Sequence, residues 1–110
     1  CAHPTEMVKV TWSARARKDL DGISAYIAEG SAYYAERTEL EIFQRSLFLE
    51  AHPKAGRMVK EVGDASIREI GYGRYRIIHW LVSDAEVVII AVVHGSRKLT
   101  PGTVLARRRK

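Results

Sequence analysis

Two apolar runs near the end of the sequence constrain its fold more than any other feature. They read YRIIHWLV (75–82) and EVVIIAVVH (86–94), and only Ser83-Asp84-Ala85 lies between them. Apolar runs joined by so short a loop predict a β-hairpin. A strand with one face in water would alternate apolar and polar residues, and these runs do not. We therefore expect both faces of the hairpin to be covered, one by helices and the other by the remaining chain or by a partner.

The N-terminal part predicts a strand followed by a helix. VKVTW (8–12) alternates apolar and polar residues, which indicates a half-buried strand. Ser13 is suited to cap a helix, because its hydroxyl can accept a bond from an unpaired amide of the first turn. The apolar face of this helix falls at Ala16, Leu20, Ile23 and Ile27. We expect Gly30 to end the helix in the left-handed conformation.

A second helix follows after a very short turn. Ser31 can cap it, and it should stop before Pro53, because the residue before a proline is driven out of helical geometry. Its apolar stripe comprises Leu40, Phe43 and Leu47, with Ile42 and Leu49 beside it. Two helices joined so closely predict an antiparallel helical hairpin.

The order of the predicted elements defines the fold class. SIREI (66–70) predicts a further strand, and GYG (71–73) predicts the turn that leads into the apolar hairpin. The order is β-α-α-β-β-β. We therefore predict an α+β fold in which a helical hairpin packs on a mainly antiparallel four-stranded sheet.

Length and composition favour one domain in a reducing compartment. The chain has 110 residues and 46% hydrophobic content, which suits one core. Residues 1–6 are interpreted as a leader or remnant outside the fold, 7–99 as the domain, and 100–110 as a basic tail. The apolar run at 87–93 is far shorter than the ~20 residues of a membrane helix. The single cysteine, Cys1, cannot form an intrachain disulfide, so we expect a cytoplasmic protein.

The charge of this chain is unevenly distributed. The formal net charge is +5, and the terminal RRRK (107–110) supplies four of these positive charges. Residues 29–50 contain five acidic and two basic side chains, whereas residues 54–76 contain six basic and three acidic ones. We therefore expect one acidic and one basic side, with a tail that could contact phosphates.

Five short motifs, in this order, resemble the RelE/ParE toxin superfamily of bacterial type II toxin–antitoxin systems. They are VTWSARARKDLDGISAYI (10–27), HPKAGR (52–57), IREI (67–70), YRIIHW (75–80) and VVHGSRKL (92–99). The resemblance spans nearly the whole domain and is closer to the ParE-like toxins. It implies a small toxin that a cognate antitoxin, ParD-like or related, neutralises by laying a largely disordered segment along it.

The two branches of this superfamily imply different chemistry. The ParE-like branch poisons DNA gyrase, whereas the RelE-like branch cleaves mRNA on the ribosome with clustered basic residues and often a C-terminal tyrosine or histidine. This sequence has no tyrosine after Tyr75, and Gly71 occupies a position where RelE-like toxins commonly carry arginine. The resemblance therefore favours a gyrase inhibitor. A ribosome-dependent endonuclease and a non-toxic binding module or co-repressor remain as alternatives.

Candidate site residues follow from the two branches of the superfamily. For a nuclease, the candidate catalytic residues are His94, Arg97, Arg68 and Arg76. For contact with the antitoxin or the target, the candidates are Arg68, Arg76, Trp80, Arg97 and Lys98. His94 is better explained by packing at a strand end, and a charge within a strand, such as Arg76, is expected to be paired or at an interface. Arg97 either binds an acidic group of a partner or pairs with Glu69.

Metal and cofactor chemistry is not expected. The four histidines are scattered, and none lies at ligand spacing from another histidine or a cysteine. GYGR (71–74) looks like a phosphate-binding glycine loop but opens a strand instead of a helix. We expect no cofactor and no bound metal.

Overall fold

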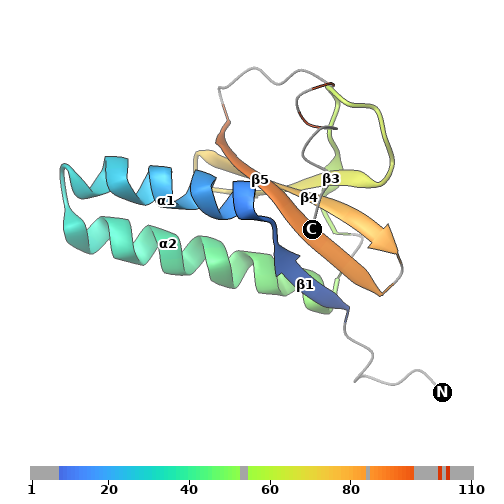
Figure 1. The fold of residues 1–110 in the computed structure, drawn as a ribbon, viewed down its shortest axis with the longest axis horizontal. Coiled ribbons are helices and arrows are strands. Elements are labelled where there is room, and N and C mark those ends of the chain that lie inside the picture. The colour runs from blue at the N-terminus through green and yellow to red at the C-terminus, as the bar shows by residue number, and fades with distance from the viewer. Residues whose placement is uncertain (1–7, 53–54, 84, 96–101, 103, 105–110) are drawn as a thin grey trace.

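A five-stranded sheet and a helical hairpin make up the fold (Figure 1). The computed structural model describes residues 8–52, 55–83, 85–95, 102 and 104. The elements are β1 (Lys9–Trp12), α1 (Ala14–Ala28), α2 (Ala32–Leu47), a 3₁₀ turn (Phe48–Glu50), β2 (Arg57–Met58), β3 (Ile67–Tyr72), β4 (Tyr75–Ser83) and β5 (Glu86–His94). The helices lie side by side and extend beyond the sheet (Figure 1).

The sheet order is β1-β5-β4-β3-β2. β1 runs parallel to β5, and every other neighbouring pair is antiparallel. The predicted α+β class and element order are therefore confirmed, but the sheet has five strands and not four. The additional strand, β2, has only two residues and both are exposed, so it carries no apolar pattern that a sequence could show.

Both helices begin at the predicted serines. The Ser13 hydroxyl accepts a hydrogen bond from the Ala16 amide at 3.1 Å, and the Ser31 hydroxyl accepts one from the Tyr34 amide at 3.2 Å. The predicted end of α1 is wrong in its geometry, because Gly30 does not adopt a positive φ. Instead the amides of Gly30 and Ser31 both donate to the Ile27 carbonyl, at 3.0 and 2.9 Å. This tight turn satisfies the helix end without a left-handed residue.

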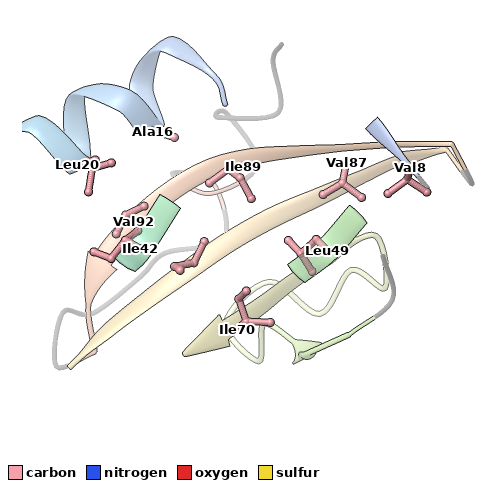
Figure 2. Packing of buried hydrophobic residues seen from close by; sticks show 10 residues of the cluster. Val8, Ala16, Leu20, Ile42, Leu49, Ile70, Val87, Ile89 and Val92 are labelled. Carbon is pink, nitrogen blue, oxygen red and sulfur yellow. The ribbon is translucent and has the colours of Figure 1, made fainter. Parts of the chain in front are cut away.

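One hydrophobic core, the helix-side core, lies between the helical hairpin and one face of the sheet (Figure 2). Its members come from the residue before β1, both helices, the 3₁₀ turn and the three long strands. They are Val8, Ala16, Leu20, Ile42, Leu49, Ile70, Ile77, Val87, Ile89 and Val92.

The face of α2 that enters this core differs from its most obvious apolar stripe. Ile42 and Leu49 are fully buried, whereas the Leu40, Phe43 and Leu47 side chains are 54%, 44% and 38% exposed. Ser46 faces inward as well, and its hydroxyl accepts a hydrogen bond from the Trp12 indole at 3.1 Å. This polar contact lets a serine occupy a core position and leaves the leucine–phenylalanine stripe in solvent.

The opposite face of the sheet has its own core. Within the part of the chain that the structure describes, the segment after β2 and Val104 cover it. Its members are Val59, Ile67, Ile78, Val88, Ile90, Ala91, Val93 and Val104. Both faces of the apolar hairpin are therefore covered, and this second cover comes from the chain itself.

None of the helices in the described residues is long and apolar enough to cross a membrane.

Candidate functional site

Arg76 on β4 is the centre of a charged cluster on the face of the sheet away from the helices. Its neighbour in register on β3 is Gly71, so no side chain blocks the diagonal path to Glu69. The guanidinium donates to Glu69 from Nε and Nη2, both at 2.6 Å. It also donates to Glu61 from Nη1 at 3.0 Å and from Nη2 at 3.1 Å. All three guanidinium nitrogens are thus bound to carboxylates.

These pairings shift the pKa values of Arg76 and Glu61. Hydrogen bonds to Glu69 and then to Glu61 raise the pKa of Arg76. The Arg76 guanidinium is also the main reason that the pKa of Glu61 is lowered. The Arg57 side chain adds a looser contact, with Nε 3.9 Å from Glu69. The expectation that Arg76 is paired is confirmed, and its partners are two carboxylates of this chain.

A hollow of ≈ 490 Å³, here called the Arg76 hollow, opens over this cluster. It is lined by Arg57, Lys60, Glu61, Glu69, Arg76 and Gly95. Three cations and two carboxylates therefore line one hollow. Both carboxylates are already bound to Arg76, the most buried of the three cations.

Arg68 lies on the other face of the sheet. It alternates with Glu69 along β3 and pairs in register with the buried His79 of β4. Its Nε atom is buried without a hydrogen-bond partner in the described part of the chain. Arg68 and Arg76, two candidates for the nuclease alternative, therefore lie on opposite faces of the sheet and do not converge on one point.

His94 and Trp80 also lie apart from any shared reaction centre. His94 pairs in register with Tyr75, next to Arg76 but on the opposite face, and its ring meets the Tyr75 ring edge-on at 5.7 Å. The packing predicted for His94 is therefore observed, although the residue is exposed. Trp80 is half-buried and packs against the second core. Arg97 and Lys98 fall outside the described residues.

A second candidate surface lies between the two helices. A hollow of ≈ 370 Å³ is lined by Trp12, Arg17, Leu20, Asp21, Glu36, Glu39, Leu40 and Phe43. Trp12 and Phe43 stack with ring centroids 6.3 Å apart, so the hollow has aromatic and aliphatic walls. Its charged side chains are three carboxylates and one arginine. We call it the helix groove.

The sequence predictions missed the helix groove as a site, although its signal was present. Leu40, Phe43 and Leu47 stand at the spacing of one helical stripe, but Ile42 and Leu49 occupy the core. An amphipathic helix with more apolar residues than one core face can bury indicates a second contact surface.

No group of three or more potential ligands that could hold a metal occurs among the described residues.

The comparisons with known proteins agree on the family. The model of a family described as "ParE toxin of type II toxin-antitoxin system, parDE" matches residues 10–99. A curated relative, Toxin RelE2 of Caulobacter vibrioides, is 31% identical over 91 residues, covering 83% of this chain and 99% of that protein.

Solved structures share the fold at lower sequence identity. A chain of the chromosomal ParDE system from P. aeruginosa has a TM-score of 0.65 and 17% identity, covering 82% of this chain and 98% of that one. The RelBE2 toxin–antitoxin complex from Mycobacterium tuberculosis gives 0.60 and 18%, covering 80% and 91%. A mutant of the E. coli toxin RelE gives 0.60 and 13%, covering 92% and 93%. The chain therefore belongs to the ParE toxin family of type II toxin–antitoxin systems, within the RelE/ParE superfamily.

Proposed function

We propose that this protein is a ParE-like toxin that inhibits DNA gyrase and is neutralised by direct binding of a ParD-like or related antitoxin. The observation that carries the choice of gyrase over mRNA is the state of Arg76, whose guanidinium is bound by Glu61 and Glu69. A cation already paired with two carboxylates is poorly suited to stabilise the charge that develops on a phosphate.

The dispersion of the other candidates supports the same choice. RNA cleavage through the 2′-hydroxyl needs a base, an acid and cations that converge on one phosphate. Among the described residues, Arg68 and His94 lie on the helix side of the sheet and Arg76 lies on the other side. An inhibitor that acts by binding needs no such convergence.

The helix groove is a suitable binding place for the antitoxin. Its apolar floor and its carboxylates fit an amphipathic helix that carries apolar anchors with basic residues beside them. The exposed stripe of Leu40, Phe43 and Leu47 extends the apolar area along α2. We therefore expect the antitoxin to place apolar side chains here and to leave the Arg76 hollow to another contact.

The function is tested with purified gyrase. Free folded toxin should inhibit supercoiling and cause cleaved DNA to accumulate, while mRNA on translating ribosomes stays intact. Adding the cognate antitoxin should restore gyrase activity. Unimpaired gyrase at a large excess of folded toxin would contradict this function.

The antitoxin surface is tested with Phe43→Ala. This side chain is 44% exposed, so truncation should affect binding more than folding. We expect a loss of about thirtyfold in antitoxin affinity, as for a central aromatic contact worth about 2 kcal/mol. Tyr26→Ala is the matched control, because Tyr26 is 74% exposed on α1 and does not line the groove. Equal affinities for the two variants in calorimetry would exclude the groove.

A RelE-like endonuclease is the second candidate, because the 31% identical relative is named Toxin RelE2. It predicts codon-positioned cuts when toxin is added to translating ribosomes. His94→Ala should then abolish the cuts seen by primer extension. A toxin-fold protein without toxicity would neither cut mRNA nor inhibit gyrase.

A further inference from the structure

The two carboxylates on Arg76 are held differently. Glu69 is 6% exposed and makes both of its contacts with Arg76 at 2.6 Å, so it is the more tightly held partner. Glu61 is 32% exposed, and its contacts are longer, at 3.0 and 3.1 Å. Both carboxylates line the Arg76 hollow, and Glu61 is the more exposed of the two. The outer edge of Arg76 is therefore closed by the weaker and more accessible of the two carboxylates.

The backbone that carries Glu61 is fixed independently of this ion pair. Val59 is fully buried in the second core, and its carbonyl accepts hydrogen bonds from the Val62 and Gly63 amides at 3.1 and 3.0 Å. Rotation of the Glu61 side chain is enough to release Arg76. The turn itself does not have to unfold.

Release of Glu61 would change the charge balance of the hollow. Its lining includes the cations Arg57, Lys60 and Arg76, and only the Glu69 carboxylate would remain beside them. The Arg57 side chain is 76% exposed, so it can reorient toward an incoming group. The opened hollow would thus offer a fork of guanidinium donors with two further cations at its rim.

We propose that an acidic peptide segment binds in the Arg76 hollow and that one of its carboxylates displaces Glu61 from Arg76. This inference goes beyond gyrase inhibition and does not depend on it. A carboxylate reproduces the two hydrogen bonds that Glu61 makes, so the exchange leaves no guanidinium nitrogen unpaired. A single carboxylate replaces the single charge of Glu61, whereas a nucleic acid would also bring its neighbouring phosphates toward Glu69, which stays in place.

The exchange is tested by following the Arg76 Nε–H signal in NMR titrations of the full chain. The probes are a capped octapeptide of alternating Glu and Gly, its Gln counterpart and an RNA octanucleotide. The proteins are the wild type, Glu61→Gln and Glu36→Gln. Glu36 lies in the helix groove and supplies the same change of charge away from Arg76.

Glu61→Gln should bind the Glu peptide about tenfold more tightly than the wild type, if Glu61 closes the site about nine-tenths of the time. The Gln peptide should not bind. Glu61→Gln combined with Arg76→Lys should lose the gain, because lysine keeps the charge and lacks the fork. Thermal melting checks that each variant is folded.

Three results would overturn the proposal. The first is equal peptide affinity in Glu61→Gln and Glu36→Gln, which would make the effect one of net charge. The second is binding without a shift of the Arg76 signal. The third is tighter binding of the RNA than of the peptide by Glu61→Gln, which would make the hollow a phosphate site.

Discussion

His79 is a titratable side chain that is buried in the interior of the fold. It is fully buried on β4, and neither ring nitrogen has a hydrogen-bond partner among the described residues. Burial is the main cause that lowers its pKa from 6.5 to about 4, and the positive charge of Arg68 acts in the same direction. Electrostatic interactions with the backbone of Ile77 and Ala55 raise the pKa and offset part of this effect. The folded protein therefore holds His79 neutral.

This lowered pKa predicts a pH-dependent stability. Between about pH 4 and pH 6.5 the unfolded chain binds the His79 proton and the folded chain does not, so the free energy of unfolding should fall as the pH falls. The full loss is about 3 kcal/mol. His79→Leu should remove this part of the slope in urea unfolding, whereas His94→Gln should keep it. The same slope in wild type and His79→Leu would disprove the assignment.

The helical hairpin is attached to the sheet by polar contacts as well as by its core. The Tyr72 hydroxyl donates to Glu41 on α2, which lowers the pKa of Glu41 and raises that of Tyr72. Arg45 donates from Nε to the Gly71 carbonyl at 3.2 Å. These contacts hold α2 against the end of β3 and so orient the helix groove relative to the sheet.

Gly22 is a weak point inside α1. It lies in the helix interior, is exposed, and an added methyl group would meet no atom within 4 Å. Gly22→Ala should therefore raise the free energy of unfolding by about 0.5–1 kcal/mol. Gly56→Ala is the contrasting control, because Gly56 has φ +87° and its added carbon would lie 2.2 Å from the Glu69 carbonyl oxygen. Thermal melting should show opposite shifts, and a lower melting temperature for Gly22→Ala would contradict the argument.

At the scale of the whole molecule, each face of the sheet carries a buried core. The helical hairpin covers one face, and the segment after β2 together with Val104 covers the other. A residue near the C-terminal end of the chain is thereby part of the core.

Val104→Ala tests this cover. The side chain is 1% exposed, so its truncation should lower the free energy of unfolding by about 1–3 kcal/mol through lost burial and a cavity. Gly102→Ala is the control and should not lower the free energy of unfolding, because Gly102 is exposed and its added carbon would contact no atom within 4 Å. Denaturant unfolding measures both variants. An unchanged midpoint for Val104→Ala would show that this residue does not support the second core.

The sequence alone determined the features that depend on neighbours in the chain. Ser13 and Ser31 capped helices because a serine hydroxyl reaches an amide three residues away. The strands at 75–82 and 86–94 followed from their continuous apolar character, and this character also required cover on both faces. The motifs gave the family before any contact was known.

Only the tertiary structure decided the features that depend on distant segments. Trp12 and Ser46 are 34 residues apart, and their hydrogen bond turns Ser46 inward and leaves Phe43 in the groove. The strand register places Arg68 and Arg76 on opposite faces. Glu61 comes from a turn with no periodic pattern, yet it closes the outer edge of Arg76. Local propensity cannot predict such contacts, because their energy comes from groups that meet only after the chain has folded.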